Sequence, residues 1–171
     1  MAAADRIQAP DLPELEQQGI EDGDVVLSGA LVERGVVRAG RVRVTESELH
    51  GVVFEEAAGL TLVDVILRDC GLPNADAREA SIRRVAVEQC RLVGVDFSGG
   101  EIGDLRVSDA SLELASFAGA RLRDVAFEHV NLSEASFQEA RLENVRFIDC
   151  ELTGADFRGR GAPAASSAGR R

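Results

Sequence analysis

Apolar residues recur at every fifth position over most of the chain. From Leu62 to Phe157 the spacing is unbroken, and the residue two places before each apolar one is Leu, Val, Ala, Cys or Gly. The other three places are mostly polar, charged or glycine. A helix has a period of 3.6 residues and a strand a period of 2, so neither element alone produces this spacing. The pattern therefore indicates an internal repeat.

The five places of the repeat have different predicted environments. Side chains two residues apart on an extended backbone point to the same face. The apolar place, i, and the place i−2 are thus expected to face inward, while i−1 and i+1 face outward. The i+2 place is left for a corner, and glycines such as Gly94, Gly99 and Gly119 stand there, as a tight turn favours.

A second period of twenty residues is superimposed on the first. Phe97, Phe117, Phe137 and Phe157 form one series, and three leucine-, isoleucine- or valine-rich series lie between them. Like residues stack on like when successive coils of a solenoid lie over one another. The two periods together predict an all-β solenoid with four sides per coil, five residues per side and about six to seven coils. No α-helix is expected after Leu62.

The regular repeat does not extend to the chain ends. From Val25 a looser version runs through two register slips before Leu62, and residues 1–24 lie outside it and are expected to form a lid or a disordered segment. The repeat region is predicted to span 25–157. Residues 158–171 contain no periodic apolar residue and are predicted to be a disordered tail.

The chain resembles the pentapeptide repeat family, whose motif is Ala-(Asp/Asn)-Leu-X-X. The closest matches to the motif are Ala-Asp-Phe-Arg-Gly at 155–159 and Val-Asp-Phe-Ser-Gly at 95–99. The resemblance covers 25–157 and implies a right-handed quadrilateral β-helix. Family members often end in a dimerising helix, which residues 158–171 do not provide. An open last coil is expected to fray or to pair with a second copy, as a homodimer through the C-terminal coil end.

Composition narrows the classes of partner. The formal charge of −11 and a pI near 4.7 disfavour direct nucleic-acid binding, which needs a basic surface, and suit a protein partner with a basic surface. All the basic residues except the two histidines are arginine, and the aromatic residues are all phenylalanine. The sequence has no run of eighteen apolar residues, and its first ten residues, with Asp5 and Pro10, do not read as a leader peptide, so a soluble cytoplasmic protein is expected.

No constellation of catalytic residues is apparent. His50 and His129 fall at outward places, and the sequence has no phosphate-binding glycine loop. Cys70, Cys90 and Cys150 share the i−2 place and form no CxxC pair. A Cys70–Cys90 disulfide is conceivable for stacked neighbours, but small core residues are the favoured interpretation. A non-enzyme with no metal or cofactor is therefore predicted.

Acidic residues gather at the corner places. These acids are Asp64, Asp69, Glu79, Asp104, Asp109, Asp124, Glu134, Glu139 and Asp149, and Arg84 is the one base there. The side made of 65–69, 85–89, 105–109, 125–129 and 145–149 has acids on both edges: Asp64, Asp104 and Asp124 on one, and Asp69, Asp109 and Asp149 on the other. Its centre includes Ile66, Ala86, Ala126 and Ile148, so the side combines an apolar centre with a charged rim, as protein interfaces do.

Two functions fit this side. The resemblance implies one of them: some pentapeptide repeat proteins are acidic rods that mimic DNA and bind type II topoisomerases such as DNA gyrase, protecting the enzyme from inhibitors. The other is a structural or adaptor module that binds a different protein, with the acids serving solubility alone. The sequence leaves both functions open.

Overall fold

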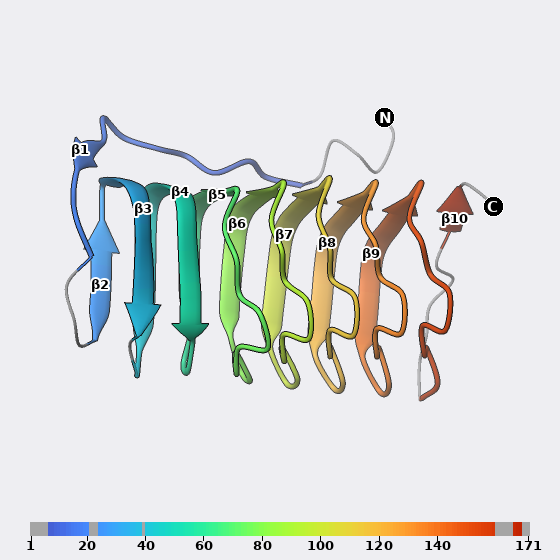
Figure 1. Cartoon of the computed structure of the whole chain (residues 1–171). Helices are drawn as coiled ribbons and strands as arrows, with labels where there is room; N and C mark the ends of the chain where they lie inside the picture. Colours follow the sequence, from blue (N-terminus) through green and yellow to red (C-terminus); the bar gives the residue numbers. More distant parts are fainter. Residues whose placement is uncertain (1–6, 21–23, 39, 160–165, 169–171) are drawn as a thin grey trace.

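Strands are the only regular elements that the computed structural model contains in the residues it describes, 7–20, 24–38, 40–159 and 166–168. They stack side by side along a rod (Figure 1). The strands are β1 (Glu16–Gln17), β2 (Val25–Ser28), β3 (Ala30–Arg38), β4 (Val42–Glu56), β5 (Thr61–Arg68), β6 (Ser81–Glu88), β7 (Glu101–Ser108), β8 (Arg121–Glu128), β9 (Arg141–Ile148) and β10 (Ser166–Ala168). All pairings are parallel, in the order β1-β3-β4-β5-β6-β7-β8-β9-β10, with β2 beside β4. The prediction of an all-β solenoid is confirmed.

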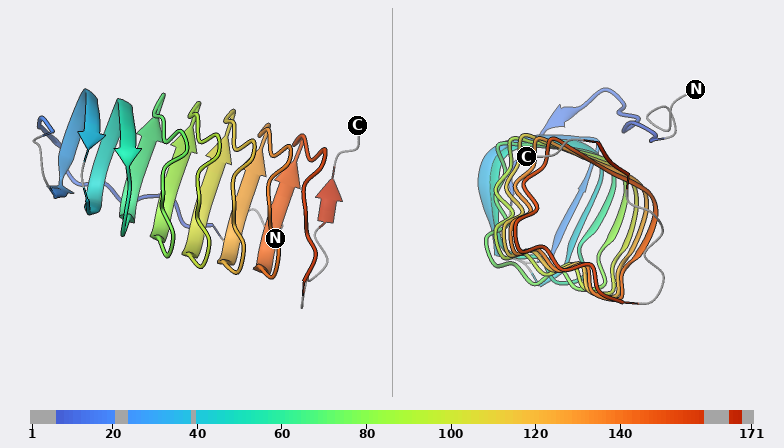
Figure 2. Two further views of the ribbon diagram at one scale, coloured as in Figure 1. Left: turned by 60° about the horizontal axis from the view of Figure 1, so that its bottom comes forward. Right: turned by 90° about the vertical axis from the view of Figure 1, so that its right-hand side faces the viewer.

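The regular coils repeat every twenty residues. Leu62 pairs with Ile82, and Ile82 with Ile102, and the same register continues to β9. Each eight-residue strand bends at its middle and so contributes two sides of the coil. The other two sides are joined to their neighbours by single bridges such as Gly71 with Arg91 and Asp76 with Asp96. Seen along the rod, the coils superimpose as a four-sided outline (Figure 2).

The predicted corner place is a corner in the structure. Every fifth residue from Asp64 to Gly159 has a positive φ, between 49° and 72° except for 141° at Gly159. This left-handed conformation suits glycine, and asparagine and aspartate tolerate it better than most residues. The abundance of Gly, Asp and Asn at these places thus has a backbone cause in addition to their polarity.

Leu114 is the least suitable corner residue. Its φ is 60° and its side chain is exposed, with 58% of the residue's surface accessible. A left-handed conformation costs a residue with a Cβ atom about 1–2 kcal/mol, and less for asparagine. We therefore expect Leu114→Asn to raise the free energy of unfolding by about 0.5–1 kcal/mol, measured by urea denaturation. A lower stability would mean that surface contacts of the leucine outweigh the backbone strain.

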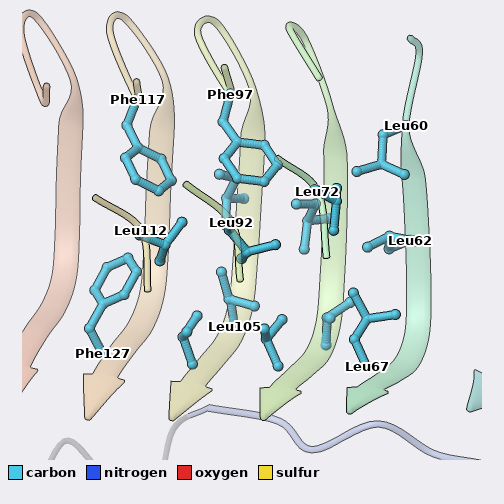
Figure 3. Close-up of a pocket in the computed structure, with 15 residues that line it drawn as sticks. Leu60, Leu62, Leu67, Leu72, Leu92, Phe97, Leu105, Leu112, Phe117 and Phe127 are labelled. Atoms are coloured by element: carbon cyan, nitrogen blue, oxygen red, sulfur yellow. The ribbon is translucent and has the colours of Figure 1, made fainter. Parts of the chain in front are cut away.

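The interior is filled by stacked columns of side chains. Phe137 stacks between Phe117 and Phe157, with ring centroids 4.9 and 4.8 Å apart, and meets Phe127 and Phe147 edge to face. Where leucines replace phenylalanines, towards the N-terminal coils, an apolar cavity of about 30 Å³ remains (Figure 3). That volume is comparable to one water molecule and every lining residue is apolar, so the described interior offers no substrate-sized site.

The register slips predicted before Leu62 coincide with the irregular strands β3 and β4. β4 has fifteen residues, and Ser47 occupies an inward place that valine or leucine fills in later coils. Ser47 is completely buried, but its hydroxyl accepts a hydrogen bond from the Ala30 amide at 3.0 Å and donates one to the Thr45 carbonyl at 2.7 Å. The Ser47 hydroxyl is thus paired both as a donor and as an acceptor, so the register slip does not bury an unpaired polar group here.

The N-terminal segment lies outside the coils and runs along the rod (Figure 2). Its strand β1 pairs with β3, at Glu16 with Ala30. Ile20 then lies over Gly35, where a Cβ atom would be 2.7 Å from the isoleucine Cδ1. Gly35 therefore has no side chain because Ile20 occupies that space. The lid predicted for residues 1–24 remains a prediction for the part that is not described.

The C-terminal edge of the rod has a partner strand. Ser166 to Ala168 pair with Arg146 to Ile148 of β9, although the sequence predicts a disordered tail for 158–171. The sequence does not predict β10, because a three-residue strand without apolar periodicity cannot be distinguished from an irregular segment. The other residues beyond Gly159 lie outside the description. A homodimer through this coil end stays a prediction, and it would compete with β10 for the same edge of β9.

Candidate protein-binding surface

The side predicted to recognise a partner exists as one face of the rod, and we call it the acidic side. Two corner columns border it: the first column consists of Asp64, Arg84, Asp104, Asp124 and Asn144, and the second column consists of Asp69, Gln89, Asp109, His129 and Asp149. Parallel strand stacking places successive members of a column about 4.8 Å apart. The structure therefore brings the predicted acids of each edge together. The two columns differ in how far their acids are exposed to solvent.

Asp64 is held inside the molecule. Its carboxylate accepts two hydrogen bonds from the Arg84 guanidinium at 2.6 Å each, and only 11% of its side chain is exposed. The Asp11 amide donates a further hydrogen bond at 3.2 Å. These contacts, with Arg84 as the main cause, lower the pKa of Asp64 below its usual value. Asp64 is thus an internal ion-pair partner and is poorly placed to meet another protein.

The other acids of the first column also have partners within the chain. The amide of Gln8 donates to Asp104 at 3.2 Å, so the N-terminal segment lies along this edge. Asp124 accepts from the Asn144 side chain and lies 3.6 Å from the Arg123 Nε atom. The first column is therefore a set of intramolecular contacts.

The second column is open to solvent. Asp109 and Asp149 each have 63% of the side chain exposed, and Asp69 is also exposed. His129 lies between the first two, 3.9 Å from Asp109 and 3.6 Å from Asp149. Of the six predicted acids, these three are the ones placed to contact a partner.

The centre of the acidic side is less apolar than predicted. Ile66 and Ile148 are half-buried at opposite ends of the face, and Ala126 is completely buried and cannot contact a partner in this arrangement. The same face also carries Arg106 and, in the coil of Ile148, Arg146, neither of which was among the predicted residues. Both stand at the same outward place of the repeat as Ile66 and Ala126, so the register alone could have identified them.

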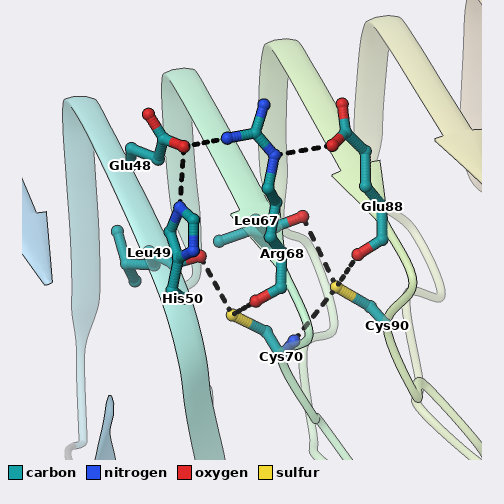
Figure 4. A network of polar contacts seen from close by, with 8 residues as sticks. All are labelled: Glu48, Leu49, His50, Leu67, Arg68, Cys70, Glu88 and Cys90. Carbon is teal, nitrogen blue, oxygen red and sulfur yellow. Dashed lines mark hydrogen bonds and ion pairs between the residues drawn. The ribbon is translucent and has the colours of Figure 1, made fainter. Parts of the chain in front are cut away.

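Arginine also links the coils across this face. Arg68 binds Glu48 on one side and Glu88 on the other, the latter at 2.6 Å, and His50 contacts Glu48 at 2.7 Å (Figure 4). Strong hydrogen bonding to Glu88 raises the pKa of Arg68 further. Exposed pairs of this kind contribute little to stability individually, and this ladder joins three coils that the backbone pairing already holds in register.

Cys70 and Cys90 lie next to this ladder and are free thiols, as is Cys150 in a later coil. The Cys70 amide donates to the Cys90 sulfur at 3.3 Å, and both residues are buried (Figure 4). The neighbouring Cys70 and burial raise the pKa of the Cys90 thiol. They are small core residues in this structure, as the sequence favoured, and the Cys70–Cys90 disulfide is not formed.

The described residues offer little for metal or membrane chemistry. They include no group of three or more His, Cys, Asp or Glu side chains arranged to hold a metal ion. None of them forms a helix of the length and apolar character that crossing a bilayer requires.

Comparisons with protein families give two matches. A model described as a pentapeptide repeat region matches residues 60–137, and a model described as pentapeptide repeats (8 copies) matches residues 127–159. The matched residues are the coils with unbroken register. A comparison with curated proteins gives no match.

The solved structures to which this chain is similar include two pentapeptide repeat proteins. One is QnrB1, a plasmid-mediated fluoroquinolone resistance protein, with 20% identity, a TM-score of 0.48, and coverage of 82% of this chain and 80% of that chain. Another is HetL, involved in heterocyst differentiation regulation in the cyanobacterium Nostoc sp. strain PCC 7120, with 18% identity, a TM-score of 0.31 and coverage of 88% of each chain.

Proposed function

Because this chain belongs to the pentapeptide repeat family, on the evidence of family models that span residues 60–159, we propose that it is a non-enzymatic module that binds another protein. The partner has a basic surface, and the acidic side of the rod binds it. The observation behind this proposal is the second column, where Asp69, Asp109 and Asp149 are exposed in a single line. The module acts in the cytoplasm and needs no cofactor.

A DNA-binding surface of a type II topoisomerase is the partner class that fits best. Such a surface uses Arg and Lys to neutralise regularly spaced phosphates. A rigid line of carboxylates repeated at the coil spacing presents the same sign of charge at fixed positions. The family resemblance suggests DNA gyrase as the first enzyme to test.

Removal of the charge from the second column tests this proposal. The triple variant Asp69→Asn, Asp109→Asn, Asp149→Asn retains residues that tolerate the left-handed corner while removing three carboxylates. We expect its affinity for immobilised DNA gyrase to fall by about tenfold or more, measured by surface plasmon resonance. Wild-type binding should weaken as salt is raised, since exposed charges are screened.

A matched control removes the same charge elsewhere. Glu79, Glu134 and Glu139 are also corner acids with positive φ, but they lie on other edges of the rod. The triple variant Glu79→Gln, Glu134→Gln, Glu139→Gln should bind within about threefold of wild type. Equal loss in both variants would show that net charge alone matters. No gyrase binding by the wild type would favour the adaptor function, with corner acids that serve backbone conformation and solubility.

A further inference from the structure

Gly103 stands in the middle of β7 without a structural reason for being glycine. Of the other glycines in described strands, Gly35 is required by Ile20, and Gly51 has a φ of +60°. Gly103 has no positive φ, and a Cβ atom there would meet only the Arg123 carbonyl at an ordinary 3.8 Å. Glycine weakens a strand interior, and where no turn requires it, it often marks close approach of a ligand.

Gly103 lines a hollow on the side of the rod next to the acidic side. This hollow has a volume of about 510 Å³. Its charged lining residues are Arg83, Arg121, Arg123, Arg141, Glu101 and Glu143. Arg83 and Arg123 are the register partners of Gly103 in the neighbouring strands. The guanidinium groups of Arg83 and Arg123 therefore lie on either side of Gly103. The backbones that carry them, in β6 and β8, are about 10 Å apart.

The arginines outnumber the acids that could neutralise them. Arg121 lies 3.3 Å from Glu101, and Arg123 lies 3.6 Å from both Glu143 and Asp124, so three acids face four arginines. Among the described residues, Arg83 and Arg141 form no ion pair. The hollow is thus a locally positive site on a chain whose net charge is −11.

We propose that this hollow binds a carboxylate of an acidic segment on a partner protein, between Arg83 and Arg123 and directly over Gly103. A guanidinium binds a carboxylate through two charge-assisted hydrogen bonds, and two of them can hold one carboxylate from both sides. Glu101 lines the hollow, and Asp104 follows Gly103 in the chain. Both carboxylates repel a phosphate group, which carries about two negative charges, more than they repel a carboxylate, which carries one. The net charge of −11 repels a nucleic acid, which carries a charge on every phosphate, more strongly than it repels a short acidic segment.

This site is independent of the proposed function. It lies on a different side of the rod, uses cations in place of carboxylates, and takes a ligand of opposite charge. Loss of gyrase binding by the second column would leave the hollow unaffected, and an inactive hollow would leave the acidic side unaffected.

The test is a ¹H–¹⁵N NMR titration of the full chain with acetylated hexaglutamate at low ionic strength. The expected result is a set of shift changes centred on the amides of residues 83, 103 and 123. The variant Gly103→Thr adds a side chain between Arg83 and Arg123, and threonine is a residue that strands favour. It should raise the thermal midpoint and weaken peptide binding at least fivefold, a combination that mere unfolding cannot produce.

Two double variants with reversed charge, one in the hollow and one on other sides of the rod, provide a matched comparison. Arg83→Glu with Arg123→Glu should weaken hexaglutamate binding at least tenfold, whereas Arg78→Glu with Arg91→Glu changes the net charge equally on other sides and should stay within twofold. Equal loss in both double variants, or full affinity in Gly103→Thr, would overturn the proposal. Tighter binding of a twelve-residue oligothymidylate to the same amides would also overturn it in favour of a nucleic-acid site.

Discussion

Replacement of Phe137 by alanine is expected to lower the free energy of unfolding by about 3–5 kcal/mol. The ring is 2% exposed, stacks on Phe117 and Phe157, and touches Phe127 and Phe147 edge to face. Truncation would leave a cavity inside a closed coil, whose hydrogen-bonded walls cannot collapse around it. Urea denaturation followed by far-UV circular dichroism measures the loss.

Phe157 provides the control for this prediction. It stacks on Phe137 in the same column but is only partly buried, because it belongs to the last described coil. Phe157→Ala should therefore cost clearly less than Phe137→Ala. Equal costs for the two variants would mean that the stabilisation comes from ring stacking alone and does not depend on burial in the coil interior.

The second large effect is expected at Arg84. Replacement by leucine leaves the Asp64 carboxylate nearly buried without the two hydrogen bonds that balance its charge. We expect a loss of about 2 kcal/mol at pH 7, within the range for an unpaired buried group and below that for a fully buried ion pair. Arg78 binds Asp76 with similar geometry on the open surface, so Arg78→Leu should leave the stability unchanged.

This prediction has a defined dependence on pH. The hydrogen bonds from Arg84 lower the pKa of Asp64 in the folded state below the unfolded value near 3.8. A lowered carboxyl pKa contributes stability above the unfolded value, and this contribution is lost as pH falls through the folded pKa. The difference in stability between wild type and Arg84→Leu should therefore be full at pH 7 and should narrow below about pH 4. A constant difference down to pH 2 would contradict the assignment to Asp64.

The coils could be predicted from the sequence because each place in the repeat has one role. A residue such as Leu62 must face inward when every fifth residue does, and the residue two places later must then turn the chain, as the positive φ of Asp64 shows. The same register located both edges of the acidic side. The register also places Arg106 and Arg146 on that face, at the outward place that Ile66 and Ala126 occupy in other coils.

The environment of the first column could not be predicted. Asp64 and Asp104 accept hydrogen bonds from the backbone amides of Asp11 and Gln8. Every residue except proline has such an amide, so the sequence does not show which amide will donate. The path of the N-terminal segment depends on such contacts and on the space that Gly35 leaves for Ile20. None of these follows a period, so the repeat carries no information about them.

The exact vertical register also restricts how this chain can change in length. Each residue of the regular coils pairs with the residues twenty places before and after it, as Leu62, Ile82 and Ile102 do. A duplication of twenty residues would add one coil and give every later side chain an equivalent neighbour. An insertion of one or two residues would instead rotate all later residues to wrong places, unless a corner loop absorbed it. Among the regular coils, a change in length that keeps the register therefore comes in steps of twenty residues, and each added coil lengthens every surface column by one residue.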